Sequence, residues 1–130
     1  MSQENVEIVR RGYERLARTG EYPWELIDPA IEVHDPPVGP DSRVYRGHEG
    51  LRAAITNVEE SFDELDFETE EIHDAGDDVL VFLRMRGRGK GSDIQIEAPL
   101  AHLWTMREGK ALRVRVLSRE EALEAAGLRR

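Results

Sequence analysis

The chain has no cysteine among its 130 residues. Disulfide bonds, thiolate metal sites and cysteine nucleophiles are therefore excluded. The chain also lacks an apolar run of the roughly 20 residues that a membrane span needs. Its first residues show neither the basic start nor the apolar segment of a signal peptide. We therefore expect a cytoplasmic protein with no membrane partner.

The signatures of metal and cofactor sites are missing as well. The four histidines show no ligand spacing such as two residues four apart on a helix, so the sequence predicts no metal site. No phosphate-binding loop and no nucleophile elbow is present. The net charge of -9 opposes binding to nucleic acid, because the phosphates would be repelled. We expect neither a cofactor nor a nucleic-acid partner.

Two kinds of periodicity divide the chain. Before about residue 62, apolar residues recur every three or four positions, which is typical of amphipathic helices. From Leu65 to Val116 they mostly alternate, which is typical of strands joined by hairpins. A capping box, Ser118-Arg-Glu-Glu121, then begins a last helix. The predicted helices span 3–18, 22–27, 48–62 and 118–126, and the predicted strands span 65–72, 79–85, 94–106 and 112–116, with one more near Ile31.

This order of elements predicts a single α+β domain over residues 1–130, because no repeat, linker or low-complexity segment interrupts it. We expect a strongly curved antiparallel sheet wrapped around the N-terminal helices. Apolar residues occupy both sides of the strands at 79–85 and 94–106, and one sheet face cannot pack on the protein's own helices. A partner usually buries such a face, so we predict a homodimer with two-fold symmetry.

Three arginines, Arg84, Arg86 and Arg88, follow one side of a predicted strand. The segment from Glu59 to Asp78 is strongly acidic. We predict that these arginines form a solvated face and pair with acidic side chains on a neighbouring strand. A basic site for an anionic ligand is the alternative interpretation.

Asp35 stands at the end of the strand predicted near Ile31. It continues the alternation of Ile31 and Val33, so its side chain is expected on the buried side. The prolines at 36 and 37 then end the strand. A carboxylate at the rim of a core is partly desolvated, which raises its pKa and suits proton transfer. The alternative is that Asp35 accepts hydrogen bonds in the turn before the prolines.

Three segments resemble those of bacterial ketosteroid isomerases. Tyr13 lies seven residues before Gly20, and the phenol donor of those enzymes lies similarly before the glycine that ends its helix. Val33-His-Asp-Pro36 is similar to their segment with the general base, and Ala98-Pro-Leu-Ala-His102 is similar to their strand with a second acid. The segments 104–110 and 121–128 are closer to SnoaL-like proteins, which include polyketide cyclases. The chain thus resembles the NTF2-like superfamily over nearly its whole length, which implies a cone-shaped α+β fold.

The resemblance implies a role for three residues. Asp35 would be the general base, Tyr13 the hydrogen-bond donor to a developing enolate, and His102 an auxiliary group. An ungapped match puts Ala101 at the position of the isomerase acid, so His102 can replace that donor only if the register shifts by one residue. The alternatives are a core Tyr13 with a hydrogen-bonded hydroxyl and a core His102 whose hydrogen bonds are satisfied.

Two classes of function remain open. The first is a cofactor-free acid–base enzyme of the isomerase, cyclase or hydrolase type, which acts on an apolar cyclic carbonyl compound in an apolar pocket. The second is a catalytically inert module for ligand binding or dimerisation. The residues expected to line the pocket are Trp24, Val33, Leu100 and Trp104. The alternative for the two tryptophans is that they complete a core and do not contact a ligand.

Overall fold

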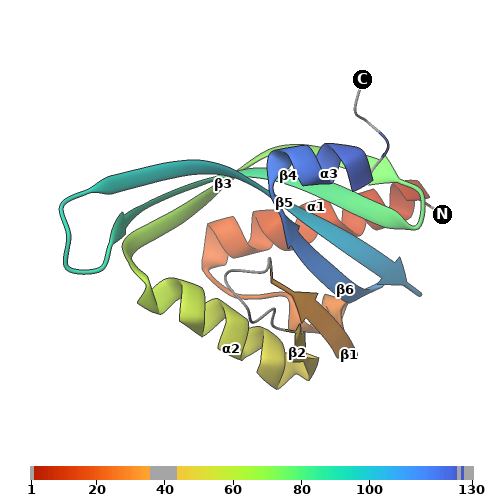
Figure 1. Cartoon of the computed structure of the whole chain (residues 1–130). Helices are drawn as coiled ribbons and strands as arrows, with labels where there is room; N and C mark the ends of the chain where they lie inside the picture. Colours follow the sequence, from red (N-terminus) through yellow and green to blue (C-terminus); the bar gives the residue numbers. More distant parts are fainter. Residues whose placement is uncertain (1, 36–43, 126, 128–130) are drawn as a thin grey trace.

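The computed structural model describes residues 2–35, 44–125 and 127. Within them, helices α1, α2 and α3 and a short 3-10 helix, η1, pack on a six-stranded sheet (Figure 1). The helices are α1 (Ser2–Thr19), η1 (Trp24–Leu26), α2 (Gly47–Glu60) and α3 (Arg119–Ala125). The strands are β1 (Ile27–His34), β2 (Val44–Arg46), β3 (Phe62–Ala75), β4 (Asp78–Gly89), β5 (Gln95–Arg107) and β6 (Lys110–Leu117).

The sheet is curved and does not close, and its strand order is β2-β1-β6-β5-β4-β3 (Figure 1). The predicted α+β cone is confirmed. All neighbouring strands are antiparallel except β1 and β6, which run parallel. The sequence did not predict this parallel pair, since alternation along a strand has the same period beside either kind of neighbour. The short strand β2 was not predicted either.

The inner face of the sheet holds the larger part of the core. Ile31 from β1 and Val79 and Val81 from β4 have no exposed surface. Helix α1 contributes Val9, and α2 contributes Leu51, to the same cluster. Figure 1 shows α1 and α2 on the side of the sheet opposite to α3. Gly20, the predicted end of the first helix, adopts a φ of 76°, a left-handed conformation that glycine reaches without strain.

The outer face carries a second apolar cluster beneath α3. It consists of Leu80, Phe82, Ala101, Leu103, Leu117 and Ala122. The predicted capping box starts this helix, because the Ser118 amide donates to Glu121 Oε1 at 3.0 Å and the Glu121 amide donates to Ser118 Oγ at 3.1 Å. Residue 126, the predicted end of the helix, lies outside the described residues.

The position of α3 corrects one premise of the homodimer prediction. We expected no helix of the protein itself to cover the outer face, but α3 folds back from β6 and buries the apolar part of it, including Phe82 at 1 % exposure. No membrane-crossing helix is found in the part of the chain that the structure describes, because none is both long and apolar enough.

The remainder of the outer face is charged, as predicted from the arginine pattern. Arg84 pairs with Glu70 and Glu97, both at 3.3 Å. Arg86 pairs with Glu97 at 2.9 Å. The further pairs in this row are Arg86 with Glu68 and Arg88 with Glu64. The arginines therefore lie on the solvated face and neutralise part of the acidic charge of β3, which is the last strand at one edge of the described sheet.

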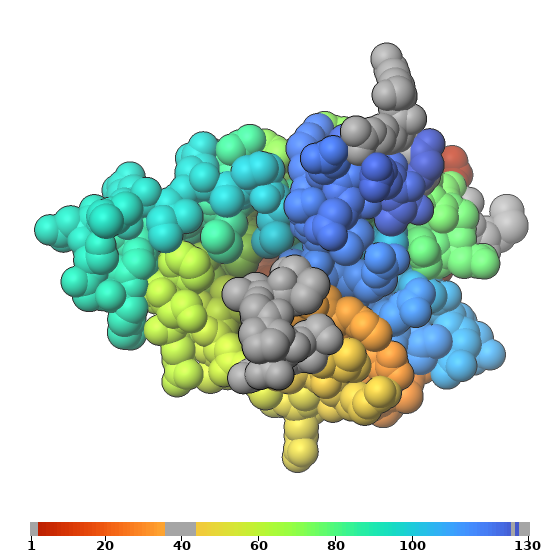
Figure 2. All heavy atoms as spheres, in the orientation of Figure 1, coloured from red at the N-terminus to blue at the C-terminus, as the bar shows by residue number. Residues whose placement is uncertain are grey.

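Strands β3, β4 and β5 extend past the helices as a distal arm, which we define as residues 62–68, 84–89 and 95–98. Figure 2 shows the end of this arm projecting beyond α2. The arm carries exposed apolar side chains, with Phe67 41 % and Ile96 37 % exposed. Ile94, just beyond the arm in the connection between β4 and β5, is 70 % exposed.

Candidate functional site

Helix α1 and strand β5 bring three polar-tipped rings together on the inner face of the sheet. Tyr13 lies one turn after Val9, on the side of α1 that packs on the core. His102 and Trp104 are two residues apart on β5, so both side chains lie on the same face. The cross-strand partners of His102 are Val81 and Val116, which extend the inner-face row.

Ala101 lies on the opposite face of β5. It has no exposed surface and belongs to the outer cluster beneath α3. Of these two residues, His102 is therefore the one that meets Tyr13, one position along from the residue that an ungapped match selects. The face of β5 that His102 occupies, which the sequence left open, is the inner one.

Tyr13 is hydrogen-bonded to both of its polar neighbours. The indole Nε1–H of Trp104 donates to Tyr13 Oη at 2.8 Å. Tyr13 Oη also lies 2.6 Å from Nδ1 of His102. The Tyr13 and His102 rings are stacked with centroids 6.1 Å apart, while Trp104 meets the Tyr13 ring edge-on at 6.3 Å. We call these three residues the Tyr13 cluster.

Burial keeps the Tyr13 cluster uncharged at neutral pH. The side chains of Tyr13 and His102 keep some exposed surface, but protein surrounds their titrating groups closely enough for desolvation to dominate their pKa values. Desolvation raises the pKa of Tyr13 well above its usual value, and the hydrogen bond from Trp104 opposes it. Desolvation lowers the pKa of His102 to about 4. The cluster therefore offers hydrogen-bonding groups without a net charge.

Asp35 follows the last residue of β1 and is partly buried. Val33 pairs with Val114 of β6, and Val114 pairs with Trp104 of β5. The pairing of β1 with β6 ends at His34 and Arg115. If the chain kept this register for one more residue, Asp35 would lie opposite Val116, the partner of His102. Adjacent strands lie roughly 4.8 Å apart, so in that register the Cα atoms of Asp35 and His102 would be separated by roughly 10 Å across β6. The prolines at 36 and 37 lie outside the described residues.

The comparisons with known proteins identify the family. The profile of the SnoaL-like domain matches residues 9–114. The chain belongs to the SnoaL-like family. No curated protein matches this sequence.

Several solved structures have the same fold as this SnoaL-like chain. An NTF2-like protein from Burkholderia thailandensis E264 is 26 % identical, with a TM-score of 0.75 over 95 % of this chain and 96 % of that one. An NTF2-like protein from Burkholderia xenovorans LB400 is 25 % identical, with a TM-score of 0.71 over 97 % of each chain. TerC, crystallised with polyporic acid, is 23 % identical, with a TM-score of 0.71 over 95 % of this chain and 97 % of its own.

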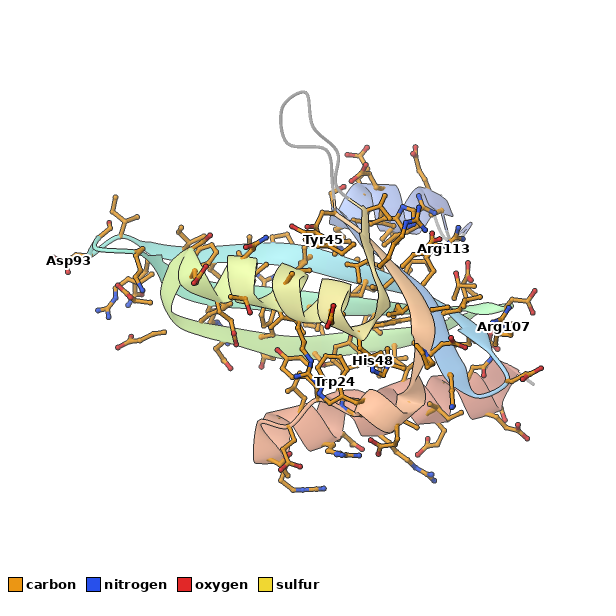
Figure 3. All side chains as sticks on the ribbon, turned by 90° about the horizontal axis from the view of Figure 1, so that it is seen from below. Trp24, Tyr45, His48, Asp93, Arg107 and Arg113 are labelled. Atoms are coloured by element: carbon orange, nitrogen blue, oxygen red, sulfur yellow. The ribbon has the colours of Figure 1, made fainter. Side chains whose placement is uncertain are left out.

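The four residues expected to line a pocket in this SnoaL-like protein have different surroundings. Val33 is a core residue at 3 % exposure, and Leu100 and Trp104 pack against the same cluster from β5. Trp24 lies beside His48 of α2, as Figure 3 shows, with ring centroids 5.2 Å apart. The Arg52 guanidinium lies 4.2 Å above the Trp24 ring. Trp24 thus joins η1 to α2, which agrees with the core interpretation of this residue.

A shallow hollow of about 420 Å³ lies elsewhere, on the distal arm. Its lining residues are Glu64, Arg86, Gly87, Arg88, Gln95, Ile96 and Glu97. None of the predicted site residues lines it, and its charges are those of the arginine row. In residues 2–35, 44–125 and 127, no three His, Asp or Glu side chains gather as the ligands of a metal ion would.

The sequence did not predict the role of Trp104 as a hydrogen-bond donor to Tyr13, because it suggested only the pocket wall or the core for this residue. The available signal was the spacing of two between His102 and Trp104. That spacing puts an indole N–H and an imidazole on the same strand face, opposite a helix that carries a phenol.

The lowered pKa of His102 predicts a loss of stability in acid. The unfolded histidine has a pKa near 6.5 and the folded one a pKa of about 4, so the unfolded chain binds more protons between these values. The contribution of neutral His102 is therefore complete above pH 6.5 and decreases as the pH falls towards 4, by at most about 3 kcal/mol. Urea unfolding at several pH values, compared between wild type and His102→Gln, should show a difference in stability that shrinks in this window. A difference in stability between the two proteins that does not change with pH would contradict this prediction.

Proposed function

We propose that this SnoaL-like protein is a cofactor-free acid–base enzyme of the isomerase, cyclase or hydrolase type, acting on an apolar cyclic carbonyl compound. The observation that carries the proposal is the uncharged, hydrogen-bonded Tyr13 cluster on the inner face of the sheet. We propose that Asp35, which follows the end of β1, lies at the rim of the same face. A carboxylate and neutral hydrogen-bond donors on one concave face are the two components that enolisation requires.

The chemistry follows from the charges of these groups. The Asp35 carboxylate would remove a proton from the carbon next to the carbonyl, and the electron pair of that C–H bond would move onto the carbonyl oxygen. A neutral donor from the Tyr13 cluster would stabilise the oxyanion, and Asp35 would then return the proton to another carbon. An uncharged, desolvated cluster suits a neutral ligand, since no buried charge must lose its water on binding.

A relative supports a small-molecule ligand. TerC, which has the same fold, was crystallised with polyporic acid. The Tyr13 cluster supplies the polar groups, and the partly buried Leu100, two residues before His102 on β5, supplies apolar surface. We therefore propose a ligand whose body is apolar and whose polar group is an oxygen acceptor.

A second candidate is a catalytically inert binding or dimerisation module. The observation in its favour is that Tyr13 Oη already has two partners within the protein, as a core tyrosine would. A homodimer also stays a prediction. The exposed apolar side chains of Phe67, Ile94 and Ile96 support it, because such surfaces are often buried by a partner.

A paired screen for binding and turnover tests the proposed function. Cyclic ketones, epoxides and polyketide fragments are offered to wild type and to Tyr13→Phe, with binding measured by calorimetry and turnover by chromatography. We expect wild type to bind and convert at least one carbonyl compound. Tyr13→Phe should bind it but react about tenfold to a hundredfold more slowly, because the cluster loses its central hydroxyl.

The matched control for this screen is Tyr22→Phe, which removes a hydroxyl from a tyrosine that packs on Trp24 instead. It should leave the rate within about twofold of wild type. Binding without turnover in all three proteins would overturn the enzyme assignment in favour of the inert module. Equal rates in wild type and Tyr13→Phe would remove Tyr13 from the mechanism.

A further inference from the structure

The hydrogen bonds of the Tyr13 cluster have a direction that can be worked out from its donors and acceptors. An indole nitrogen can only donate, so Tyr13 Oη must accept the bond from Trp104. The bond between Tyr13 Oη and His102 Nδ1 has two possible directions, because a neutral imidazole nitrogen either donates or accepts. The direction of this second bond decides which nitrogen of His102 carries the proton.

Two observations favour the phenol as the donor. The distance of 2.6 Å falls in the range of O–H donors and is shorter than a usual N–H···O bond. If Nδ1–H donated instead, Tyr13 Oη would accept two bonds and its own proton would need a third partner. Among the residues that the structure describes, Tyr13 Oη has hydrogen bonds only with His102 and Trp104.

We infer that Trp104 orients the Tyr13 hydroxyl so that its O–H donates a hydrogen bond to Nδ1 of His102, which fixes His102 in the tautomer with a proton on Nε2. Trp104 is then a positioning residue, since it acts through Tyr13. The two ring nitrogens of an imidazole point away from each other, so the Nε2–H is directed away from Tyr13. His102 is thereby a hydrogen-bond donor of the site rather than a base.

The electrostatics of the cluster agree with this arrangement. His102, with its pKa lowered to about 4, is neutral at pH 7 and so has a defined tautomer. Tyr13, with its raised pKa, keeps the proton that it donates. In this state the site recognises an acceptor, such as a carbonyl, ether or epoxide oxygen, and discriminates against a ligand that presents only N–H groups. This specificity rests on the proposed function, whereas the tautomer does not.

Nuclear magnetic resonance of the full chain, labelled with ¹⁵N at histidine and free of ligand, tests the tautomer at pH 7. The spectrum of His102→Gln identifies the His102 signals among those of the four histidines. We expect wild-type His102 to show a protonated Nε2 and an unprotonated Nδ1. Tyr13→Phe should populate the Nδ1–H form as well, because Nδ1 no longer has a donor. A wild-type spectrum with the proton on Nδ1 would overturn the inference.

The role of Trp104 is tested by Trp104→Phe, with Trp24→Phe as the matched control. Trp104→Phe removes the one hydrogen bond that Tyr13 Oη accepts, so Oη can accept from Nδ1–H instead and a mixture of His102 tautomers is expected. Trp24→Phe, which alters a ring beside His48, should leave His102 unchanged. A His102 tautomer that is unchanged in Trp104→Phe would overturn the positioning role.

The ligand class is tested separately by adding a cyclic ketone or the matching cyclic hydrocarbon to wild type. The ketone should shift the Nε2 signal of His102 and bind about tenfold more tightly than the hydrocarbon, and this preference should disappear in His102→Phe. Equal affinity for the two ligands would overturn the acceptor specificity. It would leave the tautomer result standing, and turnover in the screen is measured independently of both.

Discussion

Replacing Asp35 with asparagine is expected to lower the rate of turnover by about a thousandfold, because the amide keeps the shape of the carboxylate but cannot take up the substrate proton. Asp35 is partly buried and follows directly after the end of β1. The rate constant for any carbonyl compound converted by wild type should be compared with that of Asp35→Asn.

Glu32→Gln provides the matched control for this experiment. Glu32 lies on the same strand with the opposite parity and binds Arg46 at 2.6 Å. Its substitution also removes one carboxylate charge but should change the rate less than about twofold. Turnover that survives Asp35→Asn would contradict the catalytic assignment. For the inert module, the same substitution should leave the affinity for a neutral ligand unchanged or improve it, by removing a poorly solvated charge.

Phe82→Ala is expected to lower the free energy of unfolding by about 3–5 kcal/mol, the range for removing a buried aromatic side chain. Phe82 is 1 % exposed and lies in the outer cluster beneath α3. The Arg119 guanidinium at the start of α3 lies 4.5 Å above its ring, and His73 contacts the ring edge-on. The substitution therefore removes the largest fully buried side chain among the described residues.

Urea unfolding, followed by circular dichroism, measures this loss. Phe67→Ala is the control, because Phe67 is 41 % exposed on the neighbouring strand β3 and should cost about 1 kcal/mol or less. Losses of similar size in the two variants would show that α3 does not form a true second core with the outer face of the sheet.

Much of the fold could be predicted from local patterns. The helix that ends before Gly20 and the capping box of Ser118 and Glu121 depend on neighbours within a few residues, so the sequence shows them directly. The parallel pairing of β1 with β6 depends on contacts between residues about 80 positions apart, such as Val33 and Val114, and leaves no periodic trace. The return of α3 onto Phe82 was missed for the same reason.

The candidate site could be predicted in part. Tyr13 and His102 were selected individually, and the structure brings them into hydrogen-bonding contact. Matching by position alone pointed to Ala101, whereas the alternation of β5 turns that residue to the outer face. Parity along a strand is therefore a better guide to the site than position in an ungapped match. The bond from Trp104 was not predicted, because the spacing of two between His102 and Trp104 indicates only a shared face and does not show how deeply α1 packs on the sheet.

The acidic composition of β3 has a consequence for how molecules of this protein meet. An outermost strand presents unpaired amides and carbonyls, onto which the strand of another molecule can add. On β3 such an addition would bring two acidic strands into register. The acidic residues concerned are Asp63, Glu64, Asp66, Glu68, Glu70, Glu71 and Asp74. Only some of them are neutralised by the arginines of β4, so repulsion protects this edge from aggregation, and a specific homodimer is expected to form through a different surface.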